Sequence, residues 1–289
     1  MCVQSQYLET EGICDTPYDN PPRWAVMLSA YVDESGQQSK GLVIVAGFIG
    51  DKTAWEKCAI AWRDGLSATR RDFLHVVDLR FKREREKRLL ERLGPIPENC
   101  GLIPVSGSVN VADYYDLVEE SPSQIHASGY SMAIIPLILA IQSAIPENES
   151  YEVIFEEQTA LGFYRDKLLQ MISLIMDRDP QIKSGAKRKQ LVGWRTMTKG
   201  KTHLFEPADY LCYHLAHHAT APESVRALWT RPIVGSRKVH IKHLTREFTR
   251  DLFSIAPSLR LPIGEIELMK KEIRSGKYDP WEEMYKERP

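Results

Sequence analysis

Acidic residues at the ends of predicted strands are the first sign of chemistry in this sequence. Asp33 follows an apolar run at 25–32, and Glu156 ends a shorter run at 151–156. Runs that are apolar at nearly every position are typical of strands covered on both faces. Acids at the ends of such strands lie at the rim of a sheet, where ligands often bind. The alternative is a strand that simply runs into a solvated acidic turn.

A second pair of acids lies at the start of a predicted helix. Glu206 and Asp209 are three residues apart, so they share one helix face. Together with Asp33 and Glu156 they supply hard oxygen ligands from separate elements, which suit Mg²⁺ or Mn²⁺ without any Cys or His. We therefore predict that Asp33, Glu156 and Asp209 lie close enough to share a cation, with Glu206 as a fourth ligand. In the alternative interpretation, Glu206 only interacts favourably with the helix dipole.

The hairpin around Asp33 sets the direction of its side chain. Successive strand residues point to opposite faces, so only one of Asp33 and Glu34 can aim inward, and we predict that it is Asp33. Ser35 and Gly36 are predicted to turn the chain. The apolar run at 41–50 then follows at hairpin distance and predicts an antiparallel partner strand.

The remaining elements predict one α/β domain. Strands are expected at 102–111, 151–156 and 190–197, and helices at 52–68 (with Thr53 as cap), 81–93, 123–144, 162–177 and 205–219. Without an insertion at about 53–100, the order is β-β-β-α-β-α-β-α. We expect a loosely ordered leader at 1–22, a main domain at 23–220, and a C-terminal extension at 221–289 packed on the same domain.

Composition limits the functional classes. The 289 residues are 43% hydrophobic and 27% charged, as in ordinary globular proteins, and the net charge of −1 gives no overall attraction to nucleic acid. The five cysteines form no CxxC pair, which argues against a disulfide framework or a zinc ribbon. The apolar stretch at 132–145 is too short to span a bilayer and contains Pro136. We therefore expect a cytoplasmic protein with no membrane partner.

Several short motifs occur in the order found in a known family. They are the Tyr-Val-Asp-Glu-Ser-Gly sequence at 31–36, the apolar strand at 42–49, the His-x-x-Asp-Leu element at 75–79, the acid-ended strand at 153–156 and the Ala-Asp pair at 208–209. This pattern resembles the family known as domain of unknown function thirty-eight hundred over roughly residues 25–220. That family is considered similar to the ribonuclease H-like fold, whose metal-dependent nucleases and integrases use carboxylates on strand ends and the last helix. The resemblance therefore implies a ribonuclease H-like mixed sheet flanked by helices.

The sequence departs from the family pattern at two positions. The family usually has Asp where Glu156 stands and Gln where Glu206 stands. Glu156 keeps the charge on a longer arm. Glu206 adds a charge, which is either a further ligand or a surface acid.

His75 is a candidate for proton transfer or for contact with a phosphate. It lies three residues before Asp78, so the two share a face in a helix or turn. The alternative is a partly buried histidine with one backbone hydrogen bond.

Basic residues form local groups despite the neutral total. Lys187, Arg188 and Lys189 precede the predicted strand at 190–197, and Arg237 and Lys238 lie in the extension. Few acids neutralise these groups, so we predict that they contact the phosphates of DNA or RNA. The charged helix at 81–93 mixes both signs and is typical of a solvated, ion-paired face.

These observations predict a metal-dependent nuclease that hydrolyses nucleic-acid phosphodiester bonds, using Mg²⁺ or Mn²⁺ held by the four acids, in a defence system or a mobile element. Two such cations about 3.5–4 Å apart can activate water and stabilise the leaving oxygen. The alternative is a non-catalytic subunit of the same fold, which binds nucleic acid or joins a complex through the insertion or the extension. A protein partner or a second copy of the chain is compatible with either.

The basic loop generates a first test. Replacing Lys187, Arg188 and Lys189 together by Ala should weaken nucleic-acid binding and flatten its salt dependence, because each lost phosphate contact lowers the slope by about 0.7–0.9. Fluorescence anisotropy across a salt series measures this slope. An unchanged slope would remove the loop from the binding surface.

Overall fold

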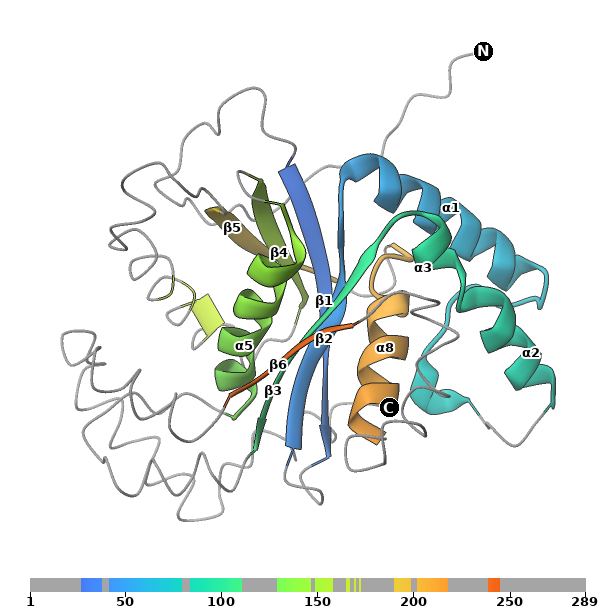
Figure 1. Ribbon diagram of the computed structural model, residues 1–289. Coiled ribbons are helices and arrows are strands. Elements are labelled where there is room, and N and C mark those ends of the chain that lie inside the picture. Colours follow the sequence, from blue (N-terminus) through green and yellow to red (C-terminus); the bar gives the residue numbers. More distant parts are fainter. Residues whose placement is uncertain are drawn as a thin grey trace.

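The computed structural model contains a six-stranded mixed sheet with helices packed on it (Figure 1). It describes residues 27–37, 42–79, 84–110, 129–146, 149–157, 190–198, 202–217 and 239–244, together with 165, 166, 169 and 172. The strands are β1 (Met27–Gln37), β2 (Leu42–Gly50), β3 (Ile103–Asn110), β4 (Ser150–Glu156), β5 (Gln190–Met197) and β6 (His240–Leu244). The predicted α/β class is confirmed.

The helices of the described ranges surround this sheet. They are α1 (Lys52–Ser67), the 3-10 helix η2 (Val76–Asp78), α2 (Glu84–Leu93), α3 (Ile96–Asn99), α5 (Gly129–Ala144) and α8 (Glu206–His217). α1, η2, α2 and α3 lie between β2 and β3 in the chain, where the helical insertion was expected.

The strand order is β5-β4-β1-β2-β3-β6. β1, β2 and β3 are antiparallel to one another in turn, whereas β4 runs parallel to β1 on its other side and β5 runs parallel to β4. The first and fourth strands of the chain, β1 and β4, therefore lie side by side. Because β1 and β4 are parallel, their C-terminal ends lie at the same edge of the sheet.

Helices cover both faces of the sheet. α5 packs on one face, where its side chains join residues such as Val32 and Val45 in one core cluster. α1, α2 and α8 pack on the other face, where Tyr31, Ala46 and Ile154 belong to a second cluster (Figure 1). Since both faces are covered, the central strands are apolar at nearly every position, as their sequences indicated.

The structure corrects two local predictions. Ser35 and Gly36 do not turn the chain, because β1 continues to Gln37 and Gly36 pairs with Val43 of β2. The long apolar β2 offers pairing partners along this whole length, and this outweighs the turn tendency of Ser-Gly. The cap of α1 is Asp51 instead of Thr53, and its side chain accepts a hydrogen bond from the Ala54 backbone N–H at 2.7 Å.

The C-terminal extension contributes an edge strand that was not predicted. β6 pairs in parallel with β3, so this part of the extension belongs to the same sheet. The Ser108 hydroxyl and the His243 ring nitrogen Nδ1 are 3.1 Å apart across this pair. The leader at 1–22 lies outside the described residues, as do most of the predicted helix at 162–177 and most of the extension.

None of the helices in the described ranges has the length and apolarity that crossing a membrane requires. α5 is the most apolar of them, and it contains Pro136 in its interior. Its residues 132–138 are buried against the sheet.

α5 approaches the sheet most closely at Gly107 of β3. A Cβ atom at this position would lie 2.2 Å from the Leu137 backbone nitrogen and 2.4 Å from the Ala133 carbonyl oxygen. Both are backbone atoms of α5, which cannot move without displacing the helix. The glycine therefore sets the distance between the helix and the sheet.

We expect Gly107→Ala to lower the free energy of unfolding by at least about 2 kcal/mol, because the methyl group overpacks the interface between helix and sheet. Gly193→Ala is the matched control, since no atom lies within 4 Å of the corresponding Cβ position in β5. Its effect should stay within about 0.5 kcal/mol. Urea denaturation of both variants measures the difference, and equal stabilities would contradict the close approach of α5 to β3.

Candidate functional site

Asp33 lies on the face of the sheet that α8 covers. Val32 belongs to the core cluster on the α5 side of the sheet, here called the α5-side cluster, and Tyr31 belongs to the cluster on the α8 side, the α8-side cluster. Because successive strand residues point to opposite faces, Asp33 lies on the side of Tyr31 and Glu34 on the side of Val32. The Asp33 side chain is only 4% exposed, and its Oδ1 accepts a hydrogen bond from the Glu34 backbone N–H at 2.8 Å. As predicted, Asp33 is the acid that faces the helix carrying Asp209.

Glu156 ends β4 on the same face. Phe155 belongs to the α5-side cluster and Ile154 to the α8-side cluster, so Glu156 shares the side of Ile154. The parallel register between β1 and β4 runs to the pair Val32 and Phe155. The next residues on the two strands are Asp33 and Glu156, so two neighbouring strands direct these acids to one face.

α8 brings a third acid over this face. Asp209 is 7% exposed, and its Oδ2 accepts a hydrogen bond from the Val76 backbone N–H at 3.1 Å. The same oxygen lies 3.5 Å from Nδ1 of His75, which is half-buried. The interaction that the structure gives to the His75 ring is therefore with Asp209, whereas Asp78 is exposed.

Cys212 lies among these acids where α8 packs on β1 and β2. Its thiol is 3.4 Å from the Asp33 carbonyl oxygen and 3.5 Å from the Ile44 carbonyl oxygen. Burial raises the pKa of the Cys212 thiol well above its usual value, and the negative charges of Asp33, Glu34 and Asp209 raise the pKa further. The thiol therefore lies near carboxylates of both β1 and α8.

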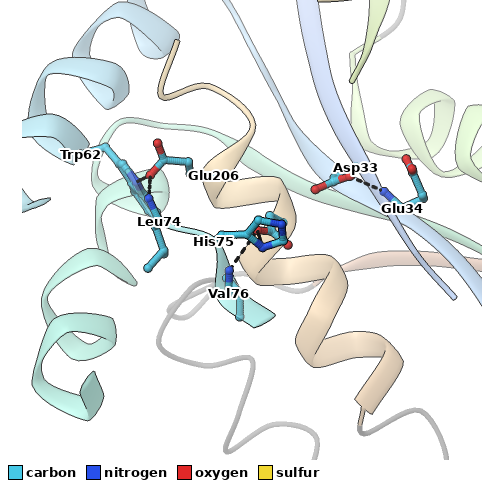
Figure 2. A network of polar contacts seen from close by, with 8 residues as sticks. Asp33, Glu34, Trp62, Leu74, His75, Val76 and Glu206 are labelled. Carbon is cyan, nitrogen blue, oxygen red and sulfur yellow. Dashed lines mark hydrogen bonds and ion pairs between the residues drawn. The ribbon is translucent and has the colours of Figure 1, made fainter. Parts of the chain in front are cut away.

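Glu206 occupies a different position, at the start of α8. Its Oε2 accepts hydrogen bonds from the Trp62 indole N–H at 2.7 Å and the Leu74 backbone N–H at 2.9 Å, and its Oε1 lies 2.8 Å from Nδ1 of His203. Figure 2 shows Trp62 and Leu74 converging on Glu206 at the start of α8, while His75 and Val76 lie beside the same helix farther along its length. Burial raises the pKa of Glu206, although the contacts with His203, Trp62 and Leu74 oppose this shift.

The acids differ in how well they suit a cation. Both Glu206 oxygens already make hydrogen bonds, so in this arrangement Glu206 positions other segments and does not fit the role of a fourth ligand. Asp33, Glu156 and Asp209 have the hard oxygens that Mg²⁺ or Mn²⁺ prefers. In the part of the chain that the structure describes, no three His, Cys, Asp or Glu side chains are grouped so that they could hold a metal ion. Their role as ligands stays a prediction.

The predicted phosphate contacts lie outside the described residues. This applies to Lys187, Arg188 and Lys189 and also to Arg237 and Lys238.

The structure adds a polar pair that sequence reasoning missed. Glu152 of β4 accepts hydrogen bonds from the Ser29 hydroxyl at 2.8 Å and from Arg195 of β5 at 3.2 Å. Glu152 lies two residues before Ile154 and therefore points to the same face of the sheet. The even spacing between Glu152 and Glu156 in the sequence could have indicated that both acids lie on this face. Burial raises the pKa of the neighbouring Tyr31 to about 12, while the charge of Arg195 opposes this rise.

The chain matches no protein-family model, and the search of curated proteins gives no match either. The resemblance drawn from the motifs therefore stays a prediction.

The hydrogen bonds of Glu206 generate a test of its role. Glu206→Ala leaves the Trp62, Leu74 and His203 donors without their acceptor and should destabilise the protein by about 3–5 kcal/mol. Glu206→Gln should fold with nearly native stability, because one amide oxygen can accept from Trp62 and Leu74 while the amide nitrogen faces Nδ1 of His203. Chemical denaturation of the two variants measures this contrast.

The pH dependence has a definite sign. The pKa of Glu206 is raised in the folded protein, so the stability that this group contributes is present below its unfolded pKa and is lost as pH rises through its folded pKa. The wild type should therefore lose stability relative to Glu206→Gln over this rise in pH. A gain in the stability of the wild type relative to Glu206→Gln over this rise in pH would contradict the raised pKa of Glu206.

Proposed function

We propose that the protein is a divalent-metal-dependent nuclease with a ribonuclease H-like architecture. The single observation that carries the proposal is the placement of three acids on one face: Asp33 and Glu156 on the neighbouring parallel strands β1 and β4, and Asp209 on α8, which packs on β1 and β2 of that face. Carboxylates are the ligands that would hold a divalent cation able to assist the hydrolysis of a phosphodiester bond.

The connectivity of the sheet supports this architecture. Three consecutive antiparallel strands are followed by two parallel strands on the other side of β1. In the described ranges, β1, β2, β3, α5, β4, β5 and α8 follow one another as the sequence pattern predicted, and α8 carries the last of the predicted carboxylates. The family that the sequence resembles usually has Gln at the position of Glu206, and a Gln there could contact the same three residues, Trp62, Leu74 and His203.

Asp33, Glu156 and Asp209 are the residues that would hold Mg²⁺ or Mn²⁺. When bound, the cation would lower the pKa of a water molecule and stabilise the leaving oxygen. His75 has its Nδ1 toward Asp209, which favours a proton on that nitrogen and would orient the ring for proton transfer or contact with a phosphate. The burial of Asp33 and Asp209 strengthens their electrostatic effect relative to exposed acids.

One observation favours the alternative, a nucleic-acid-binding or complex-forming subunit without catalysis. Asp33 and Asp209 each accept a hydrogen bond from a backbone N–H, as acids with a purely structural role also do. In that case, binding would persist without metal, and the loss of either carboxylate would affect stability more than any reaction.

Asp33→Asn distinguishes the two functions. The amide keeps the size of the side chain and its acceptor for the Glu34 N–H, but it removes the charge that holds a cation. We expect the variant to fold normally and to lose at least about 100-fold in cleavage rate, because the nucleophilic water would lose its activation. Gel assays with labelled single-stranded and duplex DNA and RNA, in Mn²⁺ and in chelator, measure cleavage.

Glu34→Gln is the matched control, because it removes a neighbouring charge whose side chain alternates to the other face of β1; its charge can act on the site only through space, so cleavage should fall far less than in Asp33→Asn. Full activity of Asp33→Asn, or equal cleavage by the wild type in chelator, would end the proposal of a metal-dependent nuclease.

A further inference from the structure

Phe73 is an aromatic side chain exposed beside the candidate site. It is 60% exposed, the largest value among the exposed large hydrophobic residues of the described ranges. Isolated exposed apolar residues are common, so exposure alone would carry no meaning. Phe73 differs from such residues in how its segment is held and in what lies next to it.

The segment around Phe73 is fixed by two acids of α8. The Leu74 backbone N–H donates to Glu206 at 2.9 Å, and the Val76 backbone N–H donates to Asp209 at 3.1 Å. The side chains of Leu74 and Val76 are fully buried in the α8-side cluster. Because Leu74 and Val76 are buried, this well-anchored backbone leaves the Phe73 side chain exposed, while the half-buried His75 ring contacts Asp209.

Phe73 is therefore close to the groups assigned to the reaction. His75 is two residues away, and two residues of chain span at most about 7 Å. The His75 ring is in turn 3.5 Å from the Asp209 carboxylate. The anchored backbone thus holds Phe73 within a short, fixed chain distance of the His75–Asp209 pair.

Two arginines, Arg70 and Arg71, precede Phe73 in the chain; Arg71 lies 3.4 Å from Glu86, and the exposed Asp72 stands between the arginines and Phe73. Arg70 is exposed, and its backbone is fixed in the left-handed region with φ of 57°. Arg85 of α2 donates a hydrogen bond to the Thr69 carbonyl oxygen at 2.9 Å, which brings a second guanidinium to the same turn. An exposed aromatic ring close to cationic side chains suits an unpaired base with its phosphates, because the ring stacks on the base and the cations attract the backbone.

We infer that Phe73 is a base-stacking residue and that the substrate presents unpaired bases at the site. This inference rests on the proposed nuclease function and narrows its substrate to single-stranded DNA or RNA, or to single-stranded segments of either. In an intact duplex the faces of a base are covered by its neighbours, so the Phe73 ring would find no partner.

Binding in chelator tests the inference without cleavage of the probe. Anisotropy with labelled single-stranded DNA and RNA oligonucleotides should show about 5- to 150-fold weaker binding for Phe73→Ala, the range expected for one stacked base. Phe73→Trp should bind at least as tightly as the wild type. Ile60→Ala is the matched control, because Ile60 on α1 is also exposed, at 53%, and should change binding less than twofold.

An oligonucleotide with a run of abasic sites completes a thermodynamic cycle. It keeps the phosphates but lacks the bases, so the wild type and Phe73→Ala should bind it equally. Unchanged binding of Phe73→Ala to the ordinary oligonucleotide would overturn the inference. An equal loss on the abasic probe would also overturn it, because Phe73 would then act on the fold or the backbone. A change in sedimentation of Phe73→Ala would instead mark a contact between two copies of the chain.

Parallel cleavage assays separate this inference from the proposed function. If the wild type cleaves in a metal-dependent way and Phe73→Ala binds the oligonucleotides as tightly as the wild type, only the stacking role of Phe73 is wrong. If Phe73→Ala loses binding to the ordinary oligonucleotide but not to the abasic one, and the wild type shows no metal-dependent cleavage, the nuclease function is wrong. The contact between Phe73 and single-stranded nucleic acid then still holds. Absence of any nucleic-acid binding by the wild type would overturn both.

Discussion

The buried carboxylate of Glu206 connects parts of the chain that are far apart in sequence, and the geometry of the site depends on it. Trp62 is 144 residues away and Leu74 is 132 residues away, yet both donate to the same oxygen. A hydrogen bond to a buried charged group contributes about 1.5–3 kcal/mol, and an unmatched buried charge costs more. The insertion helix α1, the segment before η2 and the start of α8 are therefore held in one arrangement, which also fixes where His75 meets Asp209.

Much of the sheet could be predicted from the sequence because its strands are covered on both faces. The apolar runs of β1, β2 and β4 are long and bounded by polar residues, so hydrophobicity alone indicates them. β6 carries no such signal, since three of its five residues are His or Lys. Its place depends on pairing with β3, which is a property of the tertiary structure. The extent of β1 beyond Asp33 was missed for the same reason.

The candidate site could be predicted in part. Strand alternation indicated that only one of Asp33 and Glu34 points inward, and helix spacing indicated that Glu206 and Asp209 share a face; neither pattern says which acid or which face is turned toward the sheet. The role of Glu206 could not be read in this way. An acid at the start of a helix is favourable whatever it contacts, so local sequence does not distinguish a ligand from an acceptor that organises distant donors. Only the positions of Trp62, Leu74 and His203 reveal that role.

The buried thiol of Cys212 has a practical consequence. Because thiol reagents attack the thiolate, a raised pKa and complete burial should protect this cysteine for as long as α8 stays on the sheet. Its alkylation then requires α8 to separate from β1 and β2. The rate of alkylation in native buffer would therefore measure how often the helix that carries Asp209 lifts away from the strand that carries Asp33. The protein contains its own reporter of local opening at this layer.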